Sequence, residues 1–158
     1  MTKEDNMNEF DINCWKYIIN NDDKEWKWLE LTNRSYVSLN KILEDPNKEW
    51  NWYELSYNPN ITWDMVVANI TKNWVWHHLS KNPTITWDII SSNLDKPWDW
   101  GSVSRNPNIS WSIVNNNLDK KWNWVELSQH LPIDNKIISN NLDKWYFDEL
   151  SENPSITI

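Results

Sequence analysis

Hydrophobic residues recur along the chain with a period of 24 residues, and tryptophan marks each repeat. A Trp-x-Trp pair falls in every repeat, so that its first and second members form two columns. The pairs are Trp26/Trp28, Trp50/Trp52, Trp74/Trp76, Trp98/Trp100 and Trp122/Trp124, and a sixth pair, Trp145/Phe147, comes one residue early. A third column holds Trp15, Trp63, Trp87 and Trp111. A fixed period of this length is typical of proteins whose stacked repeats share a core.

Each repeat carries two helix-start signals, which predict two short helices, A and B. Both signals are columns of the residue types that accept a hydrogen bond at a helix N-terminus. The column before helix A holds Ser38, Thr62, Thr86, Ser110 and Asp134; the column before helix B holds Asp23, Asn47, Thr71, Asp95, Asp119 and Asp143. The third repeat is therefore predicted to have helix A over about 63–70 and helix B over about 72–80. Asn82-Pro83 is expected to end helix B, because a residue before proline avoids helical geometry.

The apolar positions of helix A lie on one face, whereas those of helix B do not. Trp63, Val66 and Ile70 share a face at i, i+3 and i+7. The face recurs as Trp87/Ile90/Leu94 and Trp111/Val114/Leu118. The paired tryptophans of helix B would point about 200° apart on a regular helix. Both can be buried if B is sandwiched between neighbouring repeats, or if its first turn is not regular, and the sequence leaves both possibilities open.

An asparagine stands just before the last apolar position of helix A in four repeats, at Asn69, Asn93, Asn117 and Asn141. Two interpretations fit this residue type. It ends helix A in a left-handed conformation, or it bridges backbone groups of the next repeat.

The repeats resemble a known class of viral sequences. Residues 58–64 (Asn-Pro-Asn-Ile-Thr-Trp-Asp), 82–88 and 94–100 resemble the short Asn/Trp-rich repeats of giant DNA viruses of the Mimivirus type and their satellites, over nearly the whole chain. This resemblance implies a viral or virus-associated protein. The period with its recurring Asn-Pro is also distantly similar to the leucine-rich repeat variant, a helical superhelix with one α-helix and one tighter helix per repeat, although tryptophan replaces most of the leucines.

The predicted fold is all-α: a right-handed α-solenoid of about six 24-residue two-helix repeats. Residues 1–12 are predicted to form an acidic N-terminal segment, and residues 13–158 a single helical repeat domain. The repeats are expected at about 13–36, 37–60, 61–84, 85–108, 109–132 and 133–158. The chain stops at Ile156-Thr157-Ile158, where another helix A would begin, so an apolar end face is expected there.

Composition narrows the function. The formal net charge of −8 disfavours nucleic acids and anionic membranes as partners. One glycine is too few for a loop that holds phosphates, and a single cysteine, Cys14, allows no internal disulfide. No apolar run approaches the ~20 residues of a membrane span. The N-terminus does not resemble a signal peptide. We therefore expect a cytoplasmic location, in host cytoplasm or a virion if the protein is viral, and no secretion.

Neither catalytic nor cofactor-binding residues are predicted. His77-His78 is the only histidine pair, and adjacent helical residues diverge too far to share a metal ion. The glutamates of helix B are interpreted as a solvated acidic stripe, and the tryptophan columns as core rather than as a base-stacking platform. The glutamates of this column are Glu30, Glu54, Glu126 and Glu149.

The favoured function is a non-enzymatic scaffold for protein–protein interaction. Positions on helix B that differ between repeats would form the partner surface, while the tryptophan and leucine columns form the frame. They include Ser102, Val125, Lys81 and Gln129. The residues chosen as partner-binding are Tyr53, Tyr57, His77, His78, Arg105 and Glu126. Two alternatives remain: a structural protein that self-associates through its C-terminal end, and a nucleic-acid binder that uses tryptophan stacking.

Overall fold

A computed structural model describes residues 48–156 continuously, together with residues 13–14, 16–18, 20–21, 26–27 and 31–32. Helix is the only regular secondary structure in these residues, which confirms the all-α class. The chain forms two compact units, residues 1–74 and 75–158, and each is described by itself. The acidic segment predicted at residues 1–12 lies outside the described residues.

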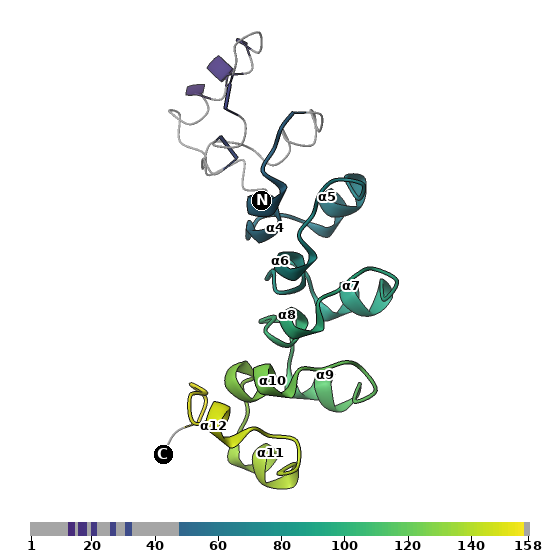
Figure 1. Cartoon of the computed structure of the whole chain (residues 1–158), viewed down its shortest axis with the longest axis vertical. Helices are drawn as coiled ribbons and strands as arrows, with labels where there is room; N and C mark the ends of the chain where they lie inside the picture. Colours follow the sequence, from purple (N-terminus) through teal and green to yellow (C-terminus); the bar gives the residue numbers. More distant parts are fainter. Residues whose placement is uncertain are drawn as a thin grey trace. The chain divides into compact units, whose positions relative to one another are not determined.

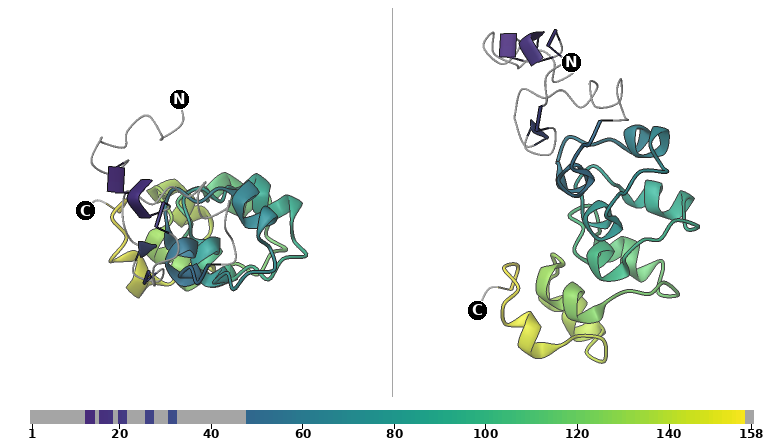
Figure 2. Two further views of the ribbon diagram at one scale, coloured as in Figure 1. Left: turned by 90° about the horizontal axis from the view of Figure 1, so that it is seen from above. Right: turned by 45° about the horizontal axis from the view of Figure 1, so that its top comes forward.

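The helices alternate between two kinds along the chain. In the first compact unit, α4 spans Trp52–Tyr57 and α5 spans Trp63–Ala68. The second unit has α6 (Trp76–Ser80), α7 (Trp87–Ser92), α8 (Trp100–Ser104), α9 (Trp111–Asn115), α10 (Trp124–His130), α11 (Asn135–Asn140) and α12 (Phe147–Leu150). Within this second unit, α6, α8, α10 and α12 pack in sequence, and α7, α9 and α11 form the other row (Figures 1 and 2). The first row corresponds to helix B and the second to helix A.

The predicted starts of helix A are confirmed from the third repeat onward. The Thr62 hydroxyl accepts a hydrogen bond from the amide of Met65, and the Thr86 hydroxyl accepts one from the amide of Ile89. Ser110 and Asp134 cap α9 and α11 in the same way, and the Asp134 carboxylate lies 2.8 Å from the Ile137 amide nitrogen. Ser38 lies outside the described residues.

The predicted start of helix B is wrong by four residues. Helix B begins at the second tryptophan, and its cap is the residue between the two tryptophans: Asn51, Asp99 or Asn123. The predicted capping column, Thr71, Asp95, Asp119 and Asp143, lies in turns instead, while Asp23 and Asn47 are outside the described residues.

Two local hydrogen bonds explain this shift. The amide of Lys96 donates to the carbonyl of Asn93 and closes a turn, and the Asp95 carboxylate binds the neighbouring Lys96 ammonium instead of a helix amide. The chain then extends through Pro97 and Trp98 before α8 begins. Helix B of the third repeat is therefore residues 76–80, and Trp74 lies outside it. Among the described pairs, from Trp50/Trp52 to Trp122/Trp124, the two tryptophans do not share a regular helix.

The asparagine after helix A closes the connection to helix B within its own repeat. The described residues contain no left-handed non-glycine residue, so a left-handed cap is wrong. The Asn93 side-chain amide donates to the carbonyl of Ile89 at 2.8 Å, and its backbone carbonyl accepts the indole N–H of Trp98 at 2.8 Å. Equivalent indole bonds join Trp74 to Asn69 and Trp122 to Asn117. Neither predicted interpretation describes this arrangement.

The core combines one face of helix A, a buried Leu or Val in each helix B and the first tryptophan of each pair from the second onward. Val66, Ile90 and Val114 are fully buried. The first-column tryptophans are buried from the second pair onward: Trp50, Trp74, Trp98, Trp122 and Trp145. The last member of each predicted helix-A face is not core, since Ile70 is 41% exposed and Leu94 and Leu118 are each 49% exposed. Helix A ends before these residues, which places them in the exposed turn.

Tryptophan rings join successive repeats edge to face. In the second compact unit, Trp76 meets Trp98 with ring centroids 5.0 Å apart, and Trp100 meets Trp122 at 5.3 Å. In the first unit, Trp52 meets Trp74 at 4.9 Å. Such pairs contribute about 0.5–1.5 kcal/mol beyond their buried area. These contacts support core packing as the role of the tryptophan pairs.

Two small polar side chains also connect successive repeats. The Ser104 hydroxyl donates to the carbonyl of Trp100 in its own helix and accepts the amide of Asn123 from the next repeat at 2.9 Å. The Asn106 side-chain amide donates, at 2.9 Å in both cases, to the carbonyl of Ser80 in the preceding repeat and to that of Ile85 at the boundary with it. Both side chains are almost completely buried, so they satisfy backbone groups that water cannot reach.

Candidate binding surface

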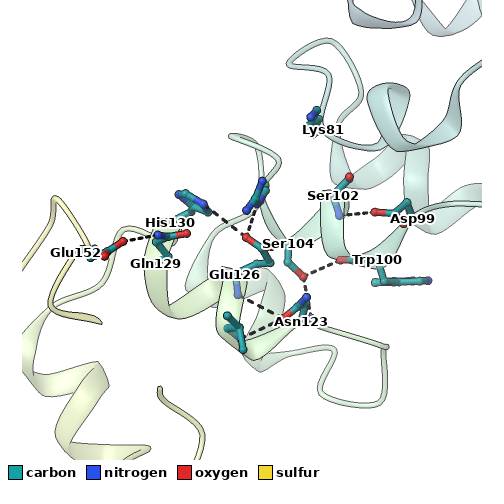
Figure 3. A network of polar contacts seen from close by, with 12 residues as sticks. Lys81, Asp99, Trp100, Ser102, Ser104, Asn123, Glu126, Gln129, His130 and Glu152 are labelled. Atoms are coloured by element: carbon teal, nitrogen blue, oxygen red, sulfur yellow. Dashed lines mark hydrogen bonds and ion pairs between the residues drawn. The ribbon is translucent and has the colours of Figure 1, made fainter. Parts of the chain in front are cut away.

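The surface of the helix-B row carries a chain of polar contacts between neighbouring repeats. In the second compact unit these contacts run from α6 to the segment after α12. They fall into one cluster around His77 and a second around Glu126, part of which is drawn in Figure 3.

The first cluster surrounds the exposed ring of His77. The His77 Nδ1 atom lies 2.8 Å from the Ser102 hydroxyl and 3.5 Å from an Asp99 carboxylate oxygen, and the Nε2 atom lies 3.3 Å from the Lys81 ammonium. The His77 ring thus contacts Lys81 of its own repeat through Nε2, and Ser102 and Asp99 of the next repeat through Nδ1.

A nucleophile paired with a general base must be reachable by its substrate. Ser102 is 1% exposed, so its hydroxyl is covered in this fold. Ser102 was predicted as a surface position and is buried, because helix α8 turns it toward His77 of the preceding repeat. Its role here is to join repeats.

Asp99 is the N-terminal cap of α8 and belongs to the same cluster. Its carboxylate accepts the Ser102 amide at 2.7 Å. The backbone hydrogen bond from Ser102, together with the nearby His77, holds the pKa of Asp99 below its usual value despite partial burial, which opposes the change. The carboxylate therefore stays charged down to lower pH than a free aspartate.

The second cluster centres on Glu126 of α10. Its carboxylate pairs with the Arg105 guanidinium of the preceding repeat and lies 3.6 Å from His130 Nε2 (Figure 3). The Glu126 side chain is only 19% exposed. The predicted solvated stripe is therefore wrong at Glu126, because this glutamate is committed to an inter-repeat ion pair. Close by, the Gln129 amide donates to Glu152 at 2.6 Å.

The two tyrosines predicted to bind a partner, Tyr53 and Tyr57, lie in the first compact unit. Tyr53 and Tyr57 are four residues apart on α4, so they share one face, and they are 55% and 61% exposed. His78 is half-buried, with its ring centroid 5.3 Å from that of His77. The structure thus brings together His77 with His78, and Arg105 with Glu126. The pairing of Arg105 with Glu126 has no local sequence signal, since 21 residues separate them.

The described part of the chain holds no group of three or more metal-ligating side chains. Its helices include none long and apolar enough to cross a bilayer. No protein-family model matches the chain, and no curated protein or solved structure matches it either.

Proposed function

We propose that this chain is a right-handed α-solenoid of about six 24-residue repeats that acts as a non-enzymatic scaffold for a protein partner. The supporting observation is that recurring and variable positions of the repeat lie in different places. The recurring first tryptophans, serines and asparagines make buried contacts, whereas positions that differ between repeats, such as Tyr53, His77 and Arg105, are exposed on helix B or just after it, even where they also contact a neighbouring repeat. The resemblance of the repeats to giant-virus sequences makes a viral or virus-associated setting part of this proposal.

The surface chemistry suits a polar protein face. It offers exposed tyrosines on α4, and imidazole, guanidinium and carboxylate groups in the second compact unit. Tyrosine and arginine are enriched among residues that dominate binding energy at interfaces. The acidic charge of the chain and the packing of the paired tryptophans favour this function over nucleic-acid binding.

A capture experiment with matched variants tests the proposal. The native chain is used to pull proteins from source lysate, beside a helix-B variant with Tyr53, Tyr57, His77 and Arg105 changed to alanine. The control changes four exposed helix-A positions to alanine: Asp88, Ser112, Asn115 and Lys136. We expect a protein that is held by the native chain and the control and lost from the helix-B variant. Equal loss from both variants would contradict the surface, and nuclease-sensitive capture released by moderate salt would favour the nucleic-acid alternative.

A charge swap sharpens this test. Changing Arg105 to glutamate together with Glu126 to arginine keeps the ion pair between repeats but reverses its polarity at the surface. If the pair only joins repeats, the double variant binds the partner like the native chain. If the partner contacts these charges, its affinity should fall by roughly tenfold or more, since charged contacts often exceed 1.4 kcal/mol at interfaces.

A further inference from the structure

A row of exposed leucines follows the turns after helix A in the second compact unit. Leu94 and Leu118 are each 49% exposed, and Leu142 is 55% exposed. Because α7, α9 and α11 form one row, the turns that follow these helices succeed one another along it (Figure 1). Leu118 has a described repeat of this unit on either side, so its exposure does not come from an end of the chain. These three residues are called the leucine ridge below.

The leucine recurs at this exposed position, although other exposed positions of helix A change from repeat to repeat. Ile70 holds the same column in the first compact unit. By contrast, one exposed column of helix A holds Asp88, Ser112 and Lys136 in the three repeats of the ridge. Exposed apolar side chains that gather along one side of a protein mark interaction sites, whereas single ones do not. A leucine that recurs while its exposed neighbours change therefore fits contact with a ligand that is itself regular.

The most accessible charge beside each ridge leucine is negative. Each leucine is followed by an aspartate and a lysine that pair with each other: Asp95/Lys96, Asp119/Lys120 and Asp143/Lys144. The aspartate side chains are 71–79% exposed, and the lysine side chains are only 24–28% exposed. The hydrogen bond from the neighbouring lysine holds the pKa of Asp95 and of Asp119 below the usual value, so both carboxylates stay charged. Lys121, which is exposed, adds one cation to the middle turn.

Leucines in a row beside carboxylates suit an amphipathic α-helix that carries basic residues along its apolar stripe. One face of a helix presents apolar side chains in line with cations beside them. The packed helices α8, α10 and α12 belong to the three repeats of the ridge. Packed helices lie roughly 8–10 Å apart, so these repeats extend over about 20 Å, which a helix covers in about four turns. A second copy of this chain fits less well, because its ridge brings the same carboxylates.

We propose that the leucine ridge, together with the carboxylates of Asp95, Asp119 and Asp143, binds a basic amphipathic helix of a protein partner. The apolar stripe of that helix packs on the three leucines, and its lysines or arginines bind the carboxylates. The ridge lies in the turns after helix A. This inference therefore does not rest on the helix-B surface, and variants of the two surfaces separate them.

A designed peptide tests the ridge. A fluorescent helical peptide of about 18 residues, or five turns, with leucines along one face and lysines elsewhere, is titrated with the full chain and followed by anisotropy. The matched probe has the same composition in an order that forms no apolar stripe. We expect saturable binding of the first peptide and binding of the second that is about tenfold weaker or more. No binding of the first peptide, or equal binding of both, would overturn the proposal, since equal binding means that charge alone is recognised.

Neutral substitutions locate the apolar contact. Leu94→Gln with Leu118→Gln removes two ridge leucines without changing the charge, and should weaken binding of the helical peptide about tenfold or more. The matched control is Tyr146→Gln with Phe147→Gln, which changes two similarly exposed apolar residues outside the ridge and should bind like the native chain. Equal loss in both variants would contradict the ridge. Circular dichroism of each variant checks that the helices are retained.

The carboxylates and the choice of occupant are tested separately. Asp95→Asn with Asp119→Asn should weaken peptide binding severalfold and reduce its salt dependence. Asp88→Asn with Asp148→Asn removes the same charge at exposed positions outside the ridge and should have a smaller effect. Equal effects of the two pairs would show that only the net charge matters. Sedimentation of the native chain tests a second copy as the occupant, and a dimer that the two leucine substitutions abolish would overturn the proposal.

Discussion

The junction between α6 and α8 and the junction between α8 and α10 share a frame and differ in the contacts around it. In both, two tryptophans meet edge to face, and a buried serine accepts an amide from the next repeat, at 3.0 Å from Asp99 and 2.9 Å from Asn123. At the first junction the buried Asn106 amide also binds the preceding repeat. At the second, the same column holds His130, whose side chain is 41% exposed.

The second junction carries an ion pair where the first carries a buried amide. Arg105 and His130 both approach Glu126 near the surface. An ion pair near the surface is typically worth roughly 0–1 kcal/mol, less than the cost of leaving buried backbone groups without partners. The two junctions therefore show that the tryptophan and serine contacts form the constant frame, while the asparagine contact strengthens particular junctions.

The largest effect should come from removing the buried amide. Replacing Asn106 with alanine is expected to lower the free energy of unfolding by about 3 kcal/mol, because the carbonyls of Ser80 and Ile85 lose their donor in a buried region. Urea unfolding followed by circular dichroism measures the change. His130→Ala is the control in the same column and should cost less than about 0.5 kcal/mol, since the side chain is exposed. If the two variants lowered the free energy of unfolding by similar amounts, the asparagine contact would not distinguish the two junctions.

The shared serine contact should be indispensable at either junction. Ser104→Ala removes the acceptor of the Asn123 amide and should cost roughly 1–3 kcal/mol. Ser151→Ala changes the same column where the residue is exposed, and should leave the unfolding midpoint nearly unchanged. If Ser104→Ala were as mild as Ser151→Ala, the serine column would not belong to the frame.

The last repeat lacks a hydrogen bond that the earlier repeats have, so restoring it should increase stability. Trp145 is buried, but its indole N–H has no hydrogen-bond partner, whereas Trp98 and Trp122 each donate to the carbonyl of the asparagine five residues earlier. Residues 117–122 read Asn-Leu-Asp-Lys-Lys-Trp, and residues 141–145 lack one lysine. Trp145 then comes four positions after Asn141 instead of five, and its indole N–H does not reach the Asn141 carbonyl.

Inserting a lysine after Lys144 should restore this hydrogen bond and stabilise the protein by about 0.5–1.5 kcal/mol. Exchange protection of the Trp145 indole proton measures the new bond directly, and the thermal midpoint measures its effect. Inserting a lysine into the exposed turn after Lys120 instead is the control, since it lengthens a spacing that already fits and should destabilise. A lysine insertion after Lys144 that leaves the indole unprotected would contradict the explanation.

The sequence predicted the parts of this architecture that depend on local chemistry and on periodicity. Thr62 and Thr86 cap helix A as expected, and Trp98 and Trp122 lie in the core. The predicted start of helix B was wrong because Asp95 and Asp99 are equally good caps by residue type. The hydrogen bonds of Lys96 and Asp95 in the turn, together with the burial of Trp98 outside the helix, leave Asp99 as the cap.

The contacts between repeats could not be read from residue types. Ser104 and Asn106 belong to classes that are mostly exposed, and the neighbouring repeats alone bury them. The same limit applies to the candidate surface. His77 and Arg105 were correctly placed at exposed positions, but Ser102 is buried under a contact with His77, 25 residues away. The recurring Leu-Ser and Asn-Pro steps were the available signal, since surface residues have no packing reason to repeat.

The smallest expected effect concerns acid stability, and it separates the caps of α8 and α10. Asp99 caps α8 with a charge, while Asn123 caps α10 without one. Because the hydrogen bond from Ser102 and the nearby His77 hold the pKa of Asp99 below its unfolded value, the charged cap stabilises the fold above about pH 4 and loses this contribution as the pH falls through the lower folded value. Asp99→Asn installs the cap of the neighbouring repeat and removes this titration.

The stability of the native chain relative to Asp99→Asn should therefore shrink as the pH is lowered from 4 toward 2. The difference at neutral pH should stay under about 1 kcal/mol, since the carboxylate is half-exposed and solvent screens its charge. Thermal unfolding of both chains over a pH series measures this difference. A gap that stays constant across the series would mean that the Asp99 charge contributes nothing to the folded state. In that case α8 and α10 would be capped by hydrogen bonding alone.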